Sequence, residues 1–419
     1  MKKRIEDKRD GKGRDGKGKI TVEQKNGQEM RSLPSKCSIS GKCGGCQYID
    51  MDYADQLKRK QKYLNKLLSD FGKPEHILGM ERPFFYRNKV HAVLHRTQKG
   101  MIYAGIYEEK THNVLPVKKC YIENEKASEI IQTITELVKS FKLTVYNETS
   151  DFGLLRHVVV RVGAVTGEIM VVLVTTSPVF PSKNNFISAL HKAHPEITTI
   201  VQNINDRRTT MVLGTRNIVM YGRGYIQDRL CGKLFRISPT SFYQVNPVQT
   251  EVLYHKAMEL AGLTGRETVI DAYCGIGTIG IAASDKAAEV IGVELNSEAV
   301  KDARVNAKLN EIRNISFYNN DAGKFMIELA EQKKSVDVVF MDPPRSGSDE
   351  PFMNALLQLS PERIVYISCG PESLARDLTY LTKSKKYQVE QICPVDMFPV
   401  TRGIETVCLL SRRRNEKNL

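Results

Sequence analysis

The sequence lacks any apolar run near the roughly 18 residues needed to span a membrane. Its first residues, MKKRIEDKRD, are charged where a secretory signal is apolar. It also has no internal repeat and no Walker lysine motif. We therefore expect a cytoplasmic protein without a membrane partner. In a reducing compartment, clustering among its nine cysteines indicates a metal site or catalysis rather than a disulfide framework.

The chain is long and basic. Its 419 residues suffice for two or three domains, and its net charge is +14. Residues 1–36 contain twelve Lys and Arg against six Asp and Glu, so +6 of that charge lies in a tail without apolar periodicity. Basic arms bind nucleic acid by releasing counterions from phosphates. A solvated, disordered tail is the alternative interpretation.

Changes in sequence pattern divide the remainder into two predicted domains. Residues 37–235 begin with a glycine-rich cysteine loop and an amphipathic helix over 52–68, then alternate strands with a helix over 126–141, which predicts an α+β central domain. Its expected strands cover 88–96, 156–163, 168–176 and 198–205. The apolar spacing of the first helix involves Tyr53, Leu57, Tyr63, Leu64 and Leu67. Residues 236–419 alternate strands and helices, the βαβ pattern of a doubly wound α/β sheet.

Two acidic residues follow the first strands of that sheet. Asp271 ends a strand in DAYCGIGT, where Gly275 and Gly277 allow close approach of a ligand to the backbone. Glu294, 23 residues later, ends the next strand and could accept hydrogen bonds from two ribose hydroxyls. This spacing is compatible with a dinucleotide or with S-adenosylmethionine.

The motif MDPPRSG favours the second of these ligands. Asp342 followed by two prolines is similar to the acid-Pro-Pro loop of S-adenosylmethionine-dependent methyltransferases. Enzymes that methylate amino groups usually have an aromatic residue after the prolines, and here Arg345 follows. Enzymes that methylate carbon 5 of cytosine in RNA usually carry a cysteine in this loop, and none is present. A simple strand terminator is the alternative.

A cysteine and a glutamate near the C-terminus fit methylation of uracil. Cys369 ends a strand in IVYISCGPES, and Glu405 precedes the terminal strand. A thiolate that adds to carbon 6 of uracil makes carbon 5 nucleophilic, and a carboxylate can then remove the proton from carbon 5. Alone, such a cysteine is more often a packing residue and such a glutamate solvated surface. Their occurrence beside cofactor motifs favours catalysis.

Six motifs, in order, resemble the RNA uracil-carbon-5 methyltransferase family over about residues 37–411: SFYQVNP, DAYCGIGT, GVELN, MDPPRSG, SCGPESLARDL and MFPVTRGIET. The resemblance implies a Rossmann-like class I methyltransferase domain with Cys369 as nucleophile and Glu405 as base. It also implies that S-adenosylmethionine is contacted by Gln244 at the methionyl end, Tyr273, Glu294 at the ribose, and Asp342 near the reaction centre. Asp321 matches an adenine-side residue, with a helix N-cap as its alternative role.

Four cysteines suggest a metal site. Cys37, Cys43 and Cys46 have the spacing C-x5-C-x2-C, and Cys120 follows 74 residues later. Four thiolates suit a structural zinc or a [4Fe–4S] cluster. The resemblance implies a [4Fe–4S] cluster with a structural role. The expected packing cysteines are Cys231, Cys274, Cys393 and Cys408.

The resemblance also makes RNA the expected partner, with the target uridine looped out or flipped. We expect 23S ribosomal RNA, because cluster-bearing relatives act there. The alternatives are transfer RNA and a non-catalytic RNA-binding or assembly factor; no obligate protein partner is implied. Three features depart from the family. Only 36 residues precede Cys37, so we expect no N-terminal β-barrel RNA-binding domain. Gly403 replaces a usual histidine, and Gly370 a usual asparagine.

Overall fold

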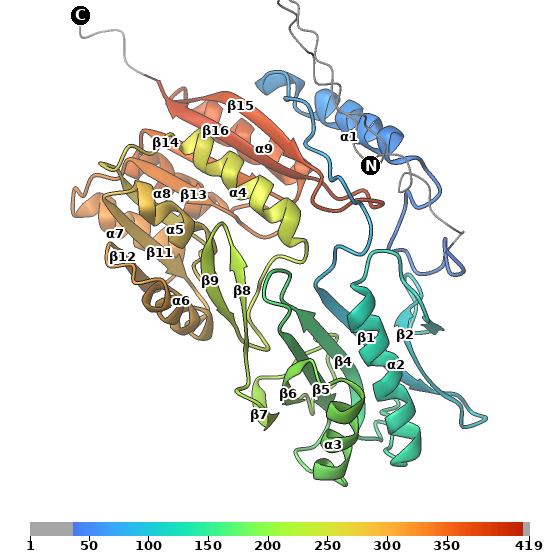
Figure 1. Ribbon diagram of the computed structural model, residues 1–419. Helices are drawn as coiled ribbons and strands as arrows, with labels where there is room; N and C mark the ends of the chain where they lie inside the picture. The colour runs from blue at the N-terminus through green and yellow to red at the C-terminus, as the bar shows by residue number, and fades with distance from the viewer. Residues whose placement is uncertain (1–36, 414–419) are drawn as a thin grey trace, which may run out of the picture.

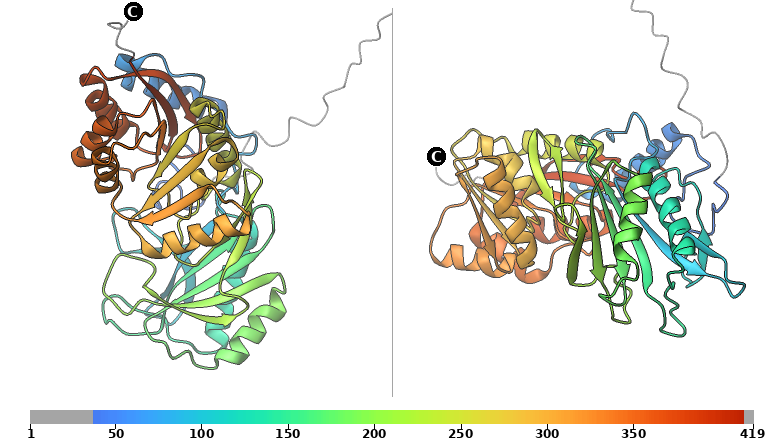
Figure 2. Two further views of the ribbon diagram at one scale, coloured as in Figure 1. Left: turned by 90° about the vertical axis from the view of Figure 1, so that its left-hand side faces the viewer. Right: turned by 60° about the horizontal axis from the view of Figure 1, so that its bottom comes forward.

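The structure, a computed structural model, describes residues 37–413. The basic tail predicted over 1–36 lies outside these residues. Two seven-stranded sheets form two lobes, one built from β1–β7 and the other from β10–β16 (Figures 1 and 2). Among the described residues no helix is both long and apolar enough to cross a membrane.

The first sheet has the strand order β3-β2-β1-β4-β5-β6-β7 and is antiparallel except for the parallel pair β5–β6. Its strands are β1 (Lys89–Arg96), β2 (Ile102–Tyr107), β3 (Val114–Pro116), β4 (Leu155–Val162), β5 (Ile169–Thr175), β6 (Ile197–Ile204) and β7 (Arg216–Tyr221). Helices α2 (Glu125–Ser140) and α3 (Lys183–Ala193) cover one face and bury an aliphatic core. The four strands predicted from their apolar runs are β1, β4, β5 and β6.

The second sheet has the order β12-β11-β10-β13-β14-β16-β15, in which the first five strands are parallel and β16 runs antiparallel to both of its neighbours, β14 and β15. Its strands are β10 (Thr268–Ala272), β11 (Glu289–Glu294), β12 (Ile315–Asn319), β13 (Val338–Met341), β14 (Arg363–Ser368), β15 (Tyr387–Val395) and β16 (Glu405–Arg412). The order reverses at β10, between β11 and β13. This is the switch point beyond which doubly wound sheets bind ligands.

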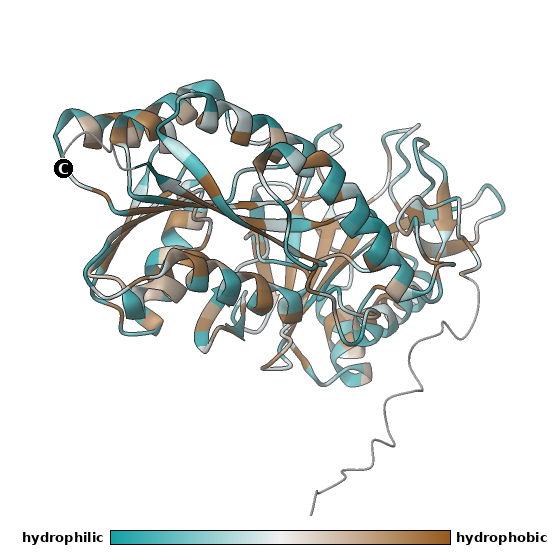
Figure 3. Cartoon of the chain, turned by 90° about the horizontal axis from the view of Figure 1, so that it is seen from above, coloured by the Kyte–Doolittle hydropathy of each residue, from teal (hydrophilic) through white to brown (hydrophobic). Residues whose placement is uncertain are grey.

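Helices cover both faces of the second sheet, and Figure 3 shows its apolar strands between two helical layers. One face packs against α4 (Pro247–Ala261), α5 (Thr278–Ala283) and α6 (Ser297–Leu309), with the short η2 (Ser284–Lys286) after α5. The other packs against α7 (Ala322–Glu331), α8 (Glu350–Leu359) and α9 (Pro371–Lys383). Because these strands are buried on both faces, their sequences are largely hydrophobic.

A shared apolar cluster joins the two lobes. The hairpin of β8 (Ile226–Leu230) and β9 (Lys233–Ile237) lies between them. Its buried side chains belong to the same cluster as Val159 and Val172 of the first sheet and Val269 of the second. Arg161, buried in β4, donates a hydrogen bond of 2.5 Å to the carbonyl of Ser241. These contacts fix the lobes relative to each other.

Helix α1 (Tyr53–Leu67), followed by η1 (Ser69–Phe71), precedes the first sheet in sequence but packs on the second. Leu64 and Leu68 belong to the core beneath α9, and Figure 1 shows α1 beside β15. The predicted helix is confirmed, yet its fully buried stripe includes two polar residues, Gln56 and Lys60. The predicted domain boundaries stay a prediction.

Candidate active site

The carboxyl edge of the second sheet gathers residues from five strands. Asp271 lies in β10, Glu294 ends β11, Asp342 follows β13 and Cys369 follows β14. Glu405 begins β16, which runs antiparallel to β14 with Ser368 opposite Thr406. Because the direction is reversed, the start of β16 lies at the edge where the parallel strands end. Chain positions 271 and 405 therefore meet at one site.

The glycine turn after β10 is fixed to the end of β11. Glu294 accepts hydrogen bonds from the backbone N–H groups of Gly275 (3.0 Å) and Asn296 (2.7 Å). Tyr273 has a positive φ of 64°, and its ring lies 5.1 Å from that of Phe352. The turn thus presents a half-buried carboxylate and an aromatic ring at the switch point.

Two other predicted cofactor residues lie on loops at the rim. Asp321 is the N-cap of α7 and accepts a 3.0 Å hydrogen bond from the N–H of Lys324, so its alternative role is realised. Gln244 is half-buried in the loop before α4, and its carbonyl accepts a hydrogen bond from the Asn88 side chain (3.2 Å). The first sheet therefore supports the loop that carries Gln244.

The candidate reaction centre combines a thiol with two acids. Burial, then the charges of Glu405 and Asp342, raise the pKa of Cys369 to about 11, against a smaller opposing effect of Arg345. Burial raises the pKa of Asp342 to about 7. Burial and Asp342 raise the pKa of Glu405 well above its usual range. Glu405 is 3% exposed, and its Oε2 has no hydrogen-bond partner within residues 37–413. A buried polar atom without a partner is rare in folded proteins, and a catalytic role is one explanation for it.

The glycine after the cysteine allows two loops to meet. A Cβ atom at Gly370 would lie 2.7 Å from the carbonyl oxygen of Arg345, closer than real Cβ contacts. The Ser373 hydroxyl, a single donor, lies within hydrogen-bond distance of the carbonyls of both Gly370 (2.8 Å) and Arg345 (3.0 Å). The acid-Pro-Pro loop therefore packs directly on the turn that bears Cys369. This close contact is a physical reason for glycine at position 370, where the family usually has asparagine.

Comparison with known proteins assigns the site to a family. The model of the tRNA (uracil-5-)-methyltransferase family matches residues 52–413. The chain belongs to this family. An uncharacterized RNA methyltransferase of Halalkalibacterium halodurans is 43% identical over 383 residues, which cover 90% of this chain and 83% of the relative. Another from Clostridium tetani is 41% identical over 385 residues, covering 91% and 83%.

A solved structure supports the same conclusion. The tRNA (uracil-54, C5)-methyltransferase of Pyrococcus abyssi, in complex with S-adenosyl-L-homocysteine, aligns with a TM-score of 0.74 and 29% identity. The alignment covers 87% of this chain and 85% of that one. The protein is therefore an S-adenosylmethionine-dependent RNA (uracil-5-)-methyltransferase with a mixed α/β fold similar to class I methyltransferases. The prediction of such an enzyme, rather than a non-catalytic factor, is confirmed.

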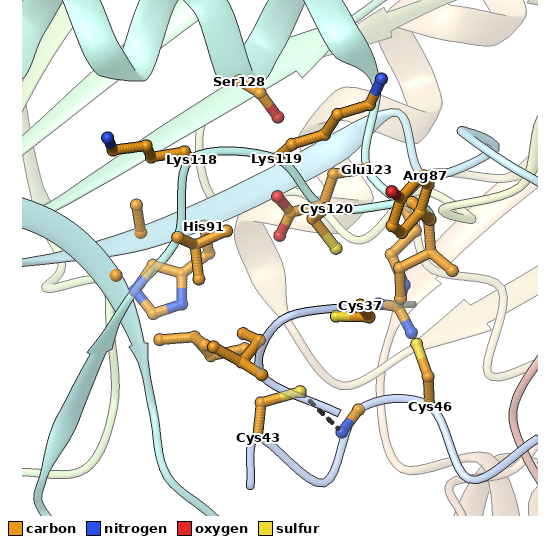
Figure 4. Close-up of a pocket in the computed structure, with 18 of the residues that line it drawn as sticks. Cys37, Cys43, Cys46, Arg87, His91, Lys118, Lys119, Cys120, Glu123 and Ser128 are labelled. Carbon is orange, nitrogen blue, oxygen red and sulfur yellow. Dashed lines mark hydrogen bonds between the residues drawn. The ribbon is translucent and has the colours of Figure 1, made fainter. Parts of the chain in front are cut away.

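The four predicted metal-binding cysteines lie around one cavity. Cys37, Cys43, Cys46 and Cys120 line a cavity of about 280 Å³ between the cysteine loop and the first sheet, and their sulfur atoms point into this common space (Figure 4). Burial, then Cys43 and Cys37, raise the pKa of Cys46 to about 12.

The sulfur donors suit a cluster, but they are not drawn together into a coordination site. In the described part of the chain, no group of three or more His, Cys, Asp or Glu side chains is arranged to hold a metal ion. The [4Fe–4S] cluster therefore stays a prediction. Of the four expected packing cysteines, Cys274, Cys393 and Cys408 are buried in apolar clusters, and Cys231 packs against one of them.

Sequence reasoning missed one buried ion pair close to the site. Nζ of Lys60 lies 2.6 Å from Oδ1 of Asp396, and the two side chains are 1% and 0% exposed. Lys60 lies three residues after Leu57 and four before Leu64, so the apolar spacing of α1 places this lysine on the buried stripe, and that position was the available signal. Asp396 also left a signal: it is the only charged residue in the apolar segment PVDMFPV that precedes Glu405.

Proposed function

We propose that the protein methylates carbon 5 of a uridine through a covalent Cys369–uracil adduct that Glu405 resolves. The observation that carries this proposal is the placement of the thiol and a buried, unpartnered carboxylate oxygen at the ends of neighbouring strands. A nucleophile and a base at one edge of a sheet are the parts that covalent catalysis needs.

The proposed reaction has three steps. The Cys369 thiolate forms a bond to carbon 6, and the electrons of the carbon 5–carbon 6 double bond move into the enolate. Carbon 5 then takes the methyl group of S-adenosylmethionine, which leaves as S-adenosylhomocysteine. Glu405 removes the proton from carbon 5, the double bond re-forms, and the Cys369 thiolate is expelled.

The two acids would assist at different points. A raised pKa makes Glu405 a stronger base once it is ionised. Asp342 lies at the edge where the methyl sulfonium is expected, and an opposite charge there would favour the ionised form of both acids. We further propose that the cofactor is contacted by the same set as expected from sequence: Gln244, Tyr273, Glu294, Asp321 and Asp342.

Two variants test the covalent step. Cys369→Ala should abolish methyl transfer while keeping S-adenosylmethionine affinity, measured by calorimetry; full activity would end the proposal. Glu405→Gln should trap a protein–RNA adduct that survives denaturing electrophoresis and carries the labelled methyl group. Because only removal of the carbon 5 proton is blocked, absence of any adduct in this variant would refute the role of Glu405.

We also propose that Cys37, Cys43, Cys46 and Cys120 hold a [4Fe–4S] cluster. When bound, such a cluster would cross-link the cysteine loop to the first sheet; the reaction needs no electron transfer. The support is the four sulfur atoms around one cavity. Protein purified without oxygen should be brown with broad visible absorbance, and Cys46→Ser should bleach it. A colourless protein loaded with zinc would contradict the proposal.

The RNA substrate has two candidates. We propose 23S ribosomal RNA, because the cysteine loop resembles that of relatives acting there. Transfer RNA is the second candidate, favoured by the substrate named for the P. abyssi structure. Nucleoside mapping of both RNAs from cells that lack the protein decides: loss of 5-methyluridine from 23S RNA alone supports the first, and loss from transfer RNA alone supports the second.

A further inference from the structure

The loop of residues 396–404, between β15 and β16, leads directly to Glu405, and one lysine of α1 holds both of its ends. The ammonium group of Lys60 donates to Oδ1 of Asp396 (2.6 Å), to the carbonyl of Phe398 (3.1 Å) and to the carbonyl of Gly403 (2.9 Å). All three N–H bonds of an ammonium are thereby used. The last acceptor, Gly403, is two residues from the proposed base.

Asp396 is itself fixed on its other side. Its Oδ2 accepts a 2.8 Å hydrogen bond from Tyr53 of α1, and the Tyr53 oxygen in turn accepts one from the N–H of Met80 (2.7 Å). The Asp396 carbonyl accepts a further bond from the Gln249 side chain (3.0 Å). The carboxylate that pairs with Lys60 thus cannot turn away without breaking several contacts.

The middle of the loop is a strained turn held from the same side. Val400 has a φ of +60°, a conformation that β-branched residues rarely adopt. Its N–H donates to Oε1 of Gln56 (2.9 Å), and its carbonyl accepts from the N–H of Tyr48 (3.0 Å). Gln47 accepts from the N–H of Arg402 (3.1 Å). Strained backbone persists where surrounding contacts over-determine it, and such positions cluster at functional sites.

Packing leaves no room for a side chain at the end of the loop. A Cβ atom at Gly403 would lie 2.9 Å from the Phe398 ring. The residue that replaces the family's histidine is thus enclosed within this set of contacts. In this chain the orientation of Glu405 has to come from the loop and from the residues that hold it.

Burial of an ion pair is weak evidence for stability, because desolvation offsets the attraction. The geometric role is better supported, since the ammonium binds two backbone carbonyls besides its counterion. We propose that Lys60 is a positioning residue for Glu405, and that α1 together with residues 47–48 forms a clamp on loop 396–404. This inference rests on the proposed role of Glu405 as base.

The clamp predicts a defect confined to one chemical step. Lys60→Met keeps an unbranched side chain of similar length but removes the ammonium group, so its three hydrogen-bond acceptors lose their donor. Adduct formation depends on Cys369 and should continue, whereas proton removal by a displaced Glu405 should slow by about 10–100-fold. Labelled methyl groups should therefore accumulate in a protein–RNA adduct during a single turnover. The substrate is total RNA from cells that lack the protein.

Matched variants make the result decisive. Lys58→Met removes an exposed lysine from the same helix, 78% exposed, and should release methylated RNA at the wild-type rate. Gln56→Ala releases the turn without removing a charge and should accumulate adduct as well, which keeps the test valid if Lys60→Met does not fold. Glu405→Gln serves as the positive control for a blocked proton removal.

The outcomes separate the two proposals. Adduct in Glu405→Gln, Gln56→Ala and Lys60→Met, with none in Lys58→Met, supports the clamp. Adduct in Glu405→Gln alone, or an equal slowing of adduct formation and release in the clamp variants, overturns it. Absence of adduct even in Glu405→Gln overturns the base assignment first, and the clamp with it.

Discussion

Raising the pH should increase the reactivity of Cys369 in the free enzyme far beyond the range in which ordinary thiols titrate. The thiolate is the reactive form, and burial with Glu405 and Asp342 raises the pKa of this thiol to about 11. Each pH unit below the pKa lowers the thiolate fraction about tenfold, so at pH 8 about one thiol in a thousand is ionised. The rate of alkylation by iodoacetamide should therefore rise about tenfold per unit from pH 7 to 10.

Two charge-removing substitutions at the site should shift the pH profile of Cys369 alkylation in opposite directions. Glu405→Gln removes the neighbouring charge that most disfavours the thiolate, and should lower the pKa of Cys369. Arg345→Gln removes the charge that opposes the increase, and should raise it. S-adenosylmethionine brings a sulfonium cation, and an opposite charge within about 4–6 Å lowers such a pKa by about 1–3 units. S-adenosylhomocysteine has the same shape without the charge and is the matched control.

The assay is alkylation of the peptide containing Cys369, followed by mass spectrometry between pH 6 and 11. A plateau already near pH 8 in the free enzyme would refute the electrostatic reasoning. Equal profiles with S-adenosylmethionine and S-adenosylhomocysteine would show that the sulfonium does not act on the thiol.

Three further predictions concern the surroundings of the reaction centre. Burial raises the pKa of Asp271 to about 8. The stability that the folded protein gains from the protonated carboxyl is therefore lost as the pH rises from about 4 to 8. Asp271→Asn should add about 1–3 kcal/mol to the free energy of unfolding at pH 8 and flatten the dependence of thermal unfolding on pH. Gly370→Ala forces its turn away from the Arg345 carbonyl and should lower kcat about 10–100-fold with the fold kept; circular dichroism and turnover check both. Arg161→Met frees the Ser241 loop that leads to Gln244, and should weaken S-adenosylmethionine binding about tenfold by calorimetry.

The parallel sheet could be predicted from sequence because its strands are buried on both faces. β13 (VVFM) and the middle of β14 (IVYI) are continuous apolar runs, β10 (TVIDA) is interrupted after its first residue only by Asp271, and all three are followed by glycine or proline turns. Strand β7 of the first sheet was missed although it contains the run IVMY, and its residues are exposed or half-buried because it lies at the edge of the sheet. Strand pairing at such an edge depends on the neighbouring strand, which no local window of sequence contains.

The difference between local sequence pattern and long-range packing also explains which site residues could be predicted from the sequence. Residues at strand ends, such as Glu294, Asp342 and Cys369, could be brought together by topology alone, because parallel strands end at one edge. Lys60 and Asp396 lie 336 residues apart. The helical spacing places Lys60 on the apolar stripe of α1, between Leu57 and Leu64, but its contact with Asp396 depends on α1 crossing to the second sheet. Long-range polar contacts are set by tertiary packing, and local periodicity does not record them.

The charges at the candidate active site also bear on the order of cofactor binding and thiol attack. Without a ligand, the raised pKa values of Cys369, Asp342 and Glu405 favour the protonated forms of all three groups, among them the proposed nucleophile Cys369 and the proposed base Glu405, which both need to lose a proton. RNA adds negative charge and would raise these values further. A cationic cofactor bound at the same edge would lower all three pKa values at once. In the proposed mechanism the sulfonium would therefore have to be in place before the thiol attacks, and once its methyl group is transferred the site would lose that cation. The uncharged thioether that remains favours protonation of Glu405, which is the direction the final step needs.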